Sequence, residues 1–406
     1  MKKNAFLKEI SADPVKTYCA IAGAALLLSL LYTLISGRGT EVFDWLVLGT
    51  SNDWELADFF RHIGYASDLK NTYYVSRDAC FPPLAYLFFH ILYMLNPLPK
   101  EISADNWQAY AMYPYEILLL VFCMIIAGIL FYEIIRISLG KQALVLTMLL
   151  VLSAPVFIAI ERGNPIFGVT VMLLWSLYLR EQPEKWKREL ALILIAVAAG
   201  FKIYPAILGL LYIKEKRFSE TKRLLVYGIL LFFVPFVFTG GIQGFRQFLD
   251  VLLHGHYNAD FMKEWSSVRG LCRSVFGKIG MSDATSVALG TAAENIFLLL
   301  SVLLAFTTGS SWKSVLFLSA AMTFYMPTSW CYNMVFYLLP LMLYFRTKGE
   351  HVLYTVLFSA IFSIPVWGLY VGITKMICLP GYLLWIIAAA SEIRAFISVR
   401  FRQDPV

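Results

Sequence analysis

Residues 114–137 read PYEILLLVFCMIIAGILFYEIIRI, a nearly unbroken apolar run. A transmembrane helix needs roughly 20 mostly apolar residues to cross about 30 Å of hydrocarbon, so this run is long enough for one crossing. Similar runs continue from Lys16 almost to the C-terminus, and 59% of the 406 residues are hydrophobic while only 15% are charged. An ordinary soluble domain carries about 25% charged residues. The sequence therefore predicts an all-α polytopic membrane protein.

Thirteen apolar segments are candidates for helices in the membrane. They lie near residues 17–36, 81–95, 114–137, 142–160, 164–180, 189–201, 203–213, 224–239, 286–308, 313–328, 331–346, 351–373 and 377–397. Segment 81–95 is short and begins with Phe81-Pro82-Pro83, so we expect a juxtamembrane or re-entrant helix there. About twelve crossings are then predicted.

Basic clusters indicate which loops face the cytoplasm, because Lys and Arg are enriched in cytoplasmic loops. They place both termini inside and predict two large outward loops, residues 37–113 and 240–285. The net charge of +7 is explained by these clusters and does not indicate a nucleic-acid partner. With no internal repeat and no stretch that would fold alone in water, residues 1–406 are predicted to form a single membrane domain. The expected location is a bacterial inner membrane.

A break in a pair of short helices is predicted at Lys202-Ile203-Tyr204-Pro205. Arg188 and Lys214 both carry cytoplasmic charge, so an even number of passes must fit into residues 189–213. Proline ends a helix, and irregular backbone at membrane depth is tolerated where it lines a polar cavity. Lys202 is therefore expected at membrane depth, facing outward.

Ionisable residues near membrane depth are costly and usually face a cavity, a partner or a ligand. Glu161 and Arg162 follow segment 142–160 in an outward turn, and Lys202 lies at the break. An arginine and a lysine that converge on one outward cavity suit a lipid-linked phosphate, and a helix beginning near Asn164 adds backbone N–H groups. The alternative is a structural cap made by Glu161 and Arg162, together with a snorkelling Lys202.

Acidic residues lie beside aromatic residues in the first outward loop. Asp44 is found in FDW, and Asp53 and Asp58 are found in NDWELADFFRH. A carboxylate can accept the proton of a sugar hydroxyl while rings stack on the sugar, so Asp53 and Asp58 are candidate catalytic residues. Arg61 and Glu161 are possible substrate-binding residues. The alternative is a solvated loop whose aromatic residues belong to the interfacial belt.

The second outward loop contains His254 and His256 in the sequence HGHYN, followed by Arg269 and Arg273. A histidine can act as an acid or base near neutral pH, so His254, His256 and Arg269 are possible substrate-binding residues. The alternative is that they are ordinary loop residues. HGH lacks further ligands at zinc spacing, and no Walker-type loop, GxSxG or HExxH sequence occurs. We therefore expect neither a metal nor a cofactor.

Four motifs follow one another along about residues 40–215: Asp58-Phe59-Phe60, Phe81-Pro82-Pro83-Leu84, Arg162-Gly163-Asn164 and Gly200-Phe201-Lys202-Ile203-Tyr204-Pro205. In their order and spacing the chain resembles glycosyltransferase family 87, within the GT-C superfamily of polyprenol-phosphate-dependent enzymes. The later segments match only in hydropathy and in the long second outward loop.

The resemblance implies a GT-C-type fold with about twelve transmembrane helices and with juxtamembrane helices in the first outward loop. It implies inverting transfer of a hexose, most often mannose, from a polyprenyl-phosphate donor to a lipid or glycan hydroxyl on the non-cytoplasmic face. By that analogy Asp58 is the general base, although Asp53 also fits. The donor phosphate would be held by Arg162, Lys202, Asn164 and Tyr204.

Two other functions compete with glycosyl transfer. A transporter or flippase would line its path with Lys202 and Glu161, but such folds often carry broken helices in both halves and only one break is found. A polysaccharide polymerase or ligase would depend on the outward-loop residues Arg269, Arg273 and His256.

Overall fold

The computed structural model describes residues 13–37, 56–76, 78–95, 114–254, 265–325, 330–347, 352–364 and 373–402. All regular secondary structure in these residues is helical, and each of the thirteen predicted apolar segments contains helix. The prediction of an all-α fold is confirmed. Asp44, Asp53 and His256 lie outside the described residues.

Four helical stretches in the described part of the chain are long and apolar enough to cross a membrane. They are Pro14–Ser36, Ile117–Val151, Asp283–Thr307 and Ile377–Ser398. A fifth candidate is the pair Phe218–Val237 and Gly241–Leu253, which bends by 109°. Other predicted segments form apolar helices of 10–17 residues. The chain is therefore a helical membrane protein, and the figure of about twelve crossings stays a prediction.

The chain divides into two compact units, each assembled from separate stretches of sequence. Unit 1 contains the described residues of 1–46, 135–157 and 259–406, and unit 2 contains those of 47–134 and 158–258. The boundaries fall inside α7 (Pro114–Leu139) and α9 (Ala154–Glu161). The single membrane domain proposed from the sequence stays a prediction.

Unit 1 is built around long apolar helices. Its elements are α2 (Pro14–Ser36), η3 (Gly140–Gln142), α8 (Ala143–Val151), α15 (Val268–Lys278), α16 (Asp283–Thr307), α17 (Ser311–Phe324), η7 (Cys331–Tyr337), α18 (Leu338–Tyr344), α19 (Val352–Ile361) and α20 (Ile373–Arg402). The Asp13 side chain caps α2 by accepting a hydrogen bond from the Val15 backbone N–H at 3.0 Å. Leu34 and Ile35 of this helix are 79% and 84% exposed, as expected for side chains that face lipid.

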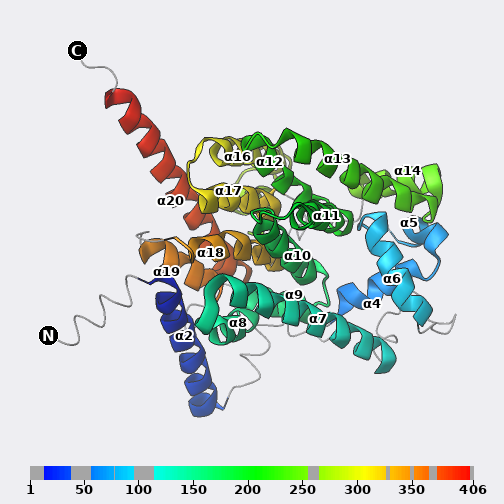
Figure 1. Ribbon diagram of the computed structural model, residues 1–406, viewed down its shortest axis with the longest axis horizontal. Coiled ribbons are helices and arrows are strands. Elements are labelled where there is room, and N and C mark those ends of the chain that lie inside the picture. The colour runs from blue at the N-terminus through cyan, green and yellow to red at the C-terminus, as the bar shows by residue number, and fades with distance from the viewer. Residues whose placement is uncertain are drawn as a thin grey trace. The chain divides into compact units, whose positions relative to one another are not determined.

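Unit 2 contains the four motifs. Its elements are α4 (Ala57–Ala66), η1 (Leu69–Asn71), α5 (Thr72–Val75), α6 (Pro83–Leu95), α10 (Ile166–Leu179), α11 (Lys185–Phe201), η4 (Tyr204–Gly209), α12 (Leu210–Lys214), α13 (Phe218–Phe233), η5 (Val234–Val237) and α14 (Gly241–His254). Helices α4, α5 and α6 of the first predicted outward loop gather with α14 (Figure 1). An aromatic core that includes Phe60, Tyr86 and Phe248 fills the space between them.

The predicted break at Lys202 is present. Helix α11 ends at Phe201, and Lys202 takes extended backbone angles, φ −144° and ψ 123°. The 3-10 helix η4 then begins at Tyr204, with Pro205 in its first turn, where the missing N–H of proline costs no hydrogen bond.

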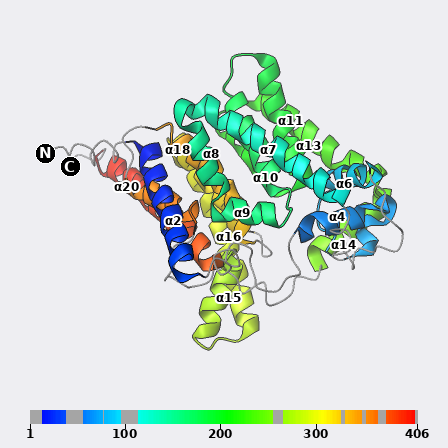
Figure 2. The same ribbon diagram turned by 90° about the horizontal axis from the view of Figure 1, so that it is seen from below.

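Helices α14 and α15 were missed by the sequence analysis, which left residues 240–285 as a loop. Both are amphipathic: α14 buries Phe248 and Val251 while Ile242 and Leu253 are exposed. Because hydropathy averages over both faces, such helices do not produce a long apolar run. Figure 2 shows α15 beside α16 in unit 1.

Candidate functional site

The first turn of α4 is attached to the turn between α9 and α10. The Leu56 backbone N–H donates to the Glu161 carbonyl oxygen at 2.8 Å, and the Asp58 N–H donates to the Arg162 carbonyl oxygen at 3.0 Å. Leu56 has a φ of 58°, in the left-handed region. These two bonds bring the first and third motifs together within unit 2, although about a hundred residues separate them.

The Asp58 carboxylate is held through both of its oxygens. Arg162 Nη2 donates to Oδ1 at 2.8 Å, and Asn164 Nδ2 donates to Oδ2 at 2.7 Å. The Asn164 side-chain oxygen in turn accepts from the Ile166 N–H at 3.0 Å, at the start of α10. A carboxylate has about four acceptor positions, so two stay open for another donor. Asn164 therefore connects the start of α10 directly to the candidate base.

Electrostatics keep Asp58 ionised. Burial by itself would raise its pKa, but the Arg162 charge and the Asn164 hydrogen bond outweigh burial and hold the pKa of Asp58 below its ordinary value. The Asp58 side chain is 15% exposed and that of Arg162 only 6%. The pair is thus nearly dry, but the carboxylate still reaches the surface.

Gly163 permits this close approach. Its φ is 64°, and a Cβ built there would lie 2.7 Å from Phe59 Cβ. An L side chain at residue 163 therefore meets both backbone strain and a collision with α4.

A Gly163→Ala variant is expected to lose at least about 2 kcal/mol of stability, because the left-handed conformation alone costs an alanine roughly 1–2 kcal/mol and the collision adds to it. The measurement is the thermal unfolding midpoint of the purified chain. Gly168→Ala in α10 is the matched control, because a Cβ there meets nothing within 4 Å. Equal midpoints for the two variants would contradict the packing argument.

The second and fourth motifs also meet in unit 2. A Cβ at Gly200 would lie 2.5 Å from Leu84 Cδ2, so α11 passes very close to α6. The Lys202 Nζ lies 4.1 Å from the centroid of the Phe81 ring, a favourable cation–π distance. Lys202 is 8% exposed, and its ammonium forms no ion pair or hydrogen bond with any residue that the structure describes.

His62 connects the two pairs of motifs, and the sequence analysis did not select it. Its ring stacks on Phe81, with centroids 3.8 Å apart and planes at 19°. Burial lowers the pKa of His62 to about 3; Asp58 opposes this shift and the positive charge of Lys202 adds to it. The signal that points to His62 is its spacing, because residues four apart on a helix share a face and Asp58 is four residues earlier.

The remaining predicted site residues are distributed as follows. Tyr204, at the start of η4, is close enough to Asp58 for an electrostatic interaction. Arg61 lies on α4 and interacts electrostatically with His62. Glu161 ends α9 and accepts the Leu56 bond through its backbone. His254 is the last residue of α14.

The outward-loop arginines belong to unit 1 and bind acidic residues there. Arg269 Nη2 lies 2.7 Å from Oε2 of Glu294, whose side chain is 2% exposed. Arg273 binds both carboxylate oxygens of Asp283 at 2.6 Å. These arginines are two of the residues on which a polymerase or ligase would depend. Both guanidinium groups form ion pairs between α15 and α16.

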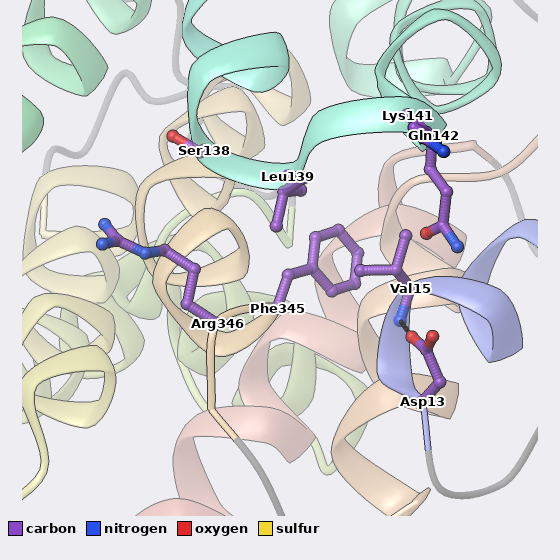
Figure 3. Close-up of a pocket in the computed structure, with 8 residues that line it drawn as sticks. All are labelled: Asp13, Val15, Ser138, Leu139, Lys141, Gln142, Phe345 and Arg346. Carbon is purple, nitrogen blue, oxygen red and sulfur yellow. Dashed lines mark hydrogen bonds between the residues drawn. The ribbon is translucent and has the colours of Figure 1, made fainter.

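A pocket of about 540 Å³ lies in unit 1 (Figure 3). It is lined by Asp13, Val15, Ser138, Leu139, Lys141, Gln142, Phe345 and Arg346. Arg346 points away from Gln142 and Lys141 in this view. None of the candidate site residues selected from the sequence lines this pocket.

A family model, described as glycosyltransferase family 87, matches residues 80–330, more than half of the chain. The matched range includes Phe81, Arg162 and Lys202 and begins after Asp58. No curated protein and no solved structure matches the chain.

Proposed function

Since the chain belongs to glycosyltransferase family 87, we propose that it moves a hexose, mannose in the first instance, from a polyprenyl-phosphate donor to a lipid or glycan hydroxyl. The observation that carries the proposal is that unit 2 contains two opposite charges, a carboxylate bound by Arg162 and Asn164 and a lysine whose ammonium contacts an aromatic ring. Asp58 is an ionised carboxylate with open acceptor positions, and Lys202 is a nearly buried cation held over an aromatic ring. Transfer from a phosphate-linked sugar needs both.

The proposed reaction uses Asp58 as the general base. The acceptor hydroxyl oxygen attacks the anomeric carbon, and its proton passes to the Asp58 carboxylate. The bond from the anomeric carbon to the phosphate oxygen breaks, and its electron pair leaves with the polyprenyl phosphate. A single displacement of this kind inverts the anomeric configuration.

Arg162 and Asn164 act in this proposal on the base, and not on the donor phosphate that the family resemblance implied for them. Both already bind Asp58, one on each oxygen. They orient the carboxylate and keep it ionised, so they are positioning residues. Lys202 is the cation that we assign to the leaving phosphate, where negative charge develops in the transition state.

Replacing Lys202 by methionine keeps the length of the side chain and removes its charge. We expect the affinity for polyprenyl phosphate to fall roughly 10- to 100-fold, as for loss of a hydrogen bond to a charged group. The measurement is equilibrium binding of polyprenyl phosphate to the purified chain in lipid nanodiscs. Lys187→Met, in the first turn of α11, is the matched control and should bind normally. A Lys202→Met variant impaired only toward the acceptor would contradict the assignment.

The proposed function is tested by transfer assays with the full chain in nanodiscs. Radiolabelled polyprenyl-phosphate mannose, glucose and galactose are each offered with extracted membrane lipids and glycans. Label in a lipid or glycan product from one of these donors supports the proposal, and analysis of the product anomer tests inversion. Labelling from a nucleotide sugar instead, or from no donor by a folded chain, would overturn the lipid-linked donor.

A further inference from the structure

His62 is buried in an aromatic setting that fixes its ring. Besides stacking on Phe81, the ring meets Tyr65 edge-on, with centroids 5.4 Å apart and planes at 84°. Its Nδ1 lies 3.0 Å from the hydroxyl oxygen of Tyr86, which is itself fully buried. The ring can therefore neither rotate nor leave without opening this core.

The hydrogen bond to Tyr86 decides which ring nitrogen carries the proton. The Tyr86 side chain is fully buried, and His62 Nδ1 is the one hydrogen-bond partner of its hydroxyl among the residues that the structure describes. A buried O–H without an acceptor is costly, so the Tyr86 O–H donates to His62 Nδ1. The neutral imidazole then has its proton on Nε2.

The Nε2–H group has no hydrogen-bond partner among the residues that the structure describes. His62 is 6% exposed, and its Nε2 atom is not fully buried. It is therefore a donor at the edge of the core that is open to a ligand. Lys202 contacts the same Phe81 ring, and its positive charge acts on His62.

We propose that His62 contacts the substrate as a neutral hydrogen-bond donor, its Nε2–H binding an oxygen of the leaving phosphate beside Lys202. This inference rests on the proposed function and adds a residue to the same site. A neutral donor stabilises the growing negative charge without repelling the lysine, and no proton leaves the ring during the step. The absence of a charge change agrees with a histidine that burial keeps neutral at physiological pH.

The test compares His62→Phe with His62→Gln in the full chain. Phenylalanine keeps an aromatic ring for the stack on Phe81 but has no donor, whereas the glutamine amide N–H can donate at a similar distance. We expect His62→Phe to lower kcat roughly 10- to 100-fold and to weaken polyprenyl-phosphate binding, and His62→Gln to recover most of both. The shape of the pH–rate profile should not change.

His90→Phe is the matched control. His90 lies on the neighbouring helix α6, outside the proposed site, and its Nδ1 is 2.7 Å from the Ala66 carbonyl oxygen at the end of α4. Transfer and phosphate binding by His62→Phe equal to those of wild type would overturn the inference. Loss of a pH limb in that variant would also overturn it, because the ring would then be transferring a proton.

If His62→Phe does not fold, Tyr86→Phe gives the answer, since it keeps His62 and removes the proton that fixes its tautomer. Weaker phosphate binding by folded Tyr86→Phe supports the inference, and unchanged binding contradicts it. Failure of the proposed function can be told apart from failure of this inference. In the first case wild type itself transfers no sugar, and polyprenyl-phosphate binding by wild type and the variants can still be compared.

Discussion

An Asp58→Asn variant is expected to lose sugar transfer roughly 10²- to 10⁴-fold, the usual contribution of a positioned general base. Asparagine has nearly the same shape, so α4 should stay attached to the α9–α10 turn through its two backbone bonds. The amide cannot accept the proton of the acceptor hydroxyl. The measurement is the initial rate of transfer per folded chain in nanodiscs, with polyprenyl-phosphate donor in excess.

Asp68→Asn is the matched control for that experiment. Asp68 precedes η1 and binds the Asn71 side chain at 2.8 Å, away from the proposed chemistry, so its variant should transfer at the wild-type rate. Asp53→Asn completes the set. If Asp53→Asn is inactive and Asp58→Asn retains transfer, the base is Asp53, the other acidic residue that the sequence offered.

The pH dependence of transfer gives a second view of Asp58. Its lowered pKa means that the carboxylate stays ionised from neutral pH to below the ordinary pKa of an aspartate. The stability that its ion pair contributes is fully present above that ordinary pKa and is lost as pH falls through the lowered pKa. A transfer rate that falls with a midpoint near pH 7 would indicate that a group other than Asp58 is the base.

An Arg162→Met variant is expected to lose about 3 kcal/mol of stability. Removing one partner of a buried ion pair leaves the other charge uncompensated, which typically costs 3–5 kcal/mol, and the partial exposure of Asp58 favours the lower value. Asn164 alone would then hold the carboxylate. The measurement is the free energy of unfolding of the purified chain from denaturant titration.

The double variant Asp58→Asn with Arg162→Met identifies the cause. Without the carboxylate, the missing guanidinium should cost much less, so the two effects should be strongly non-additive. Lys187→Met is the control for a surface pair: its bond to Glu184 lies at the exposed start of α11, and such pairs contribute about 1 kcal/mol or less. Additive effects at Asp58 and Arg162 would contradict the ion-pair argument.

The site differs from its sequence-based prediction in the partners, more than in the residues. The sequence predicted that Arg162 and Asn164 belong to one site with Asp58 and Lys202, and the resemblance assigned them to a phosphate. In the structure they bind the carboxylate of Asp58. Their residue types suit either partner, because a guanidinium and an amide donate equally well to a phosphate or a carboxylate.

The sequence alone determined the features that depend on local chemistry. Apolar runs such as residues 114–137 specify helices in a membrane, because backbone polar groups in hydrocarbon must form hydrogen bonds within their own segment. Pro205 and the basic residues on either side were enough to locate the break at Lys202, because proline interrupts a helix through its own ring and missing N–H.

The tertiary structure alone decided which distant groups meet. Asp58 and Arg162 are separated by 104 positions in the sequence, and their bond depends on Gly163 admitting Phe59 to van der Waals contact. The neutral state of His62 and the direction of its N–H group likewise depend on Phe81 and Tyr86, which no local pattern links to it. Hydropathy is a property of a segment, whereas charge state and hydrogen-bond direction are set by neighbours that packing supplies.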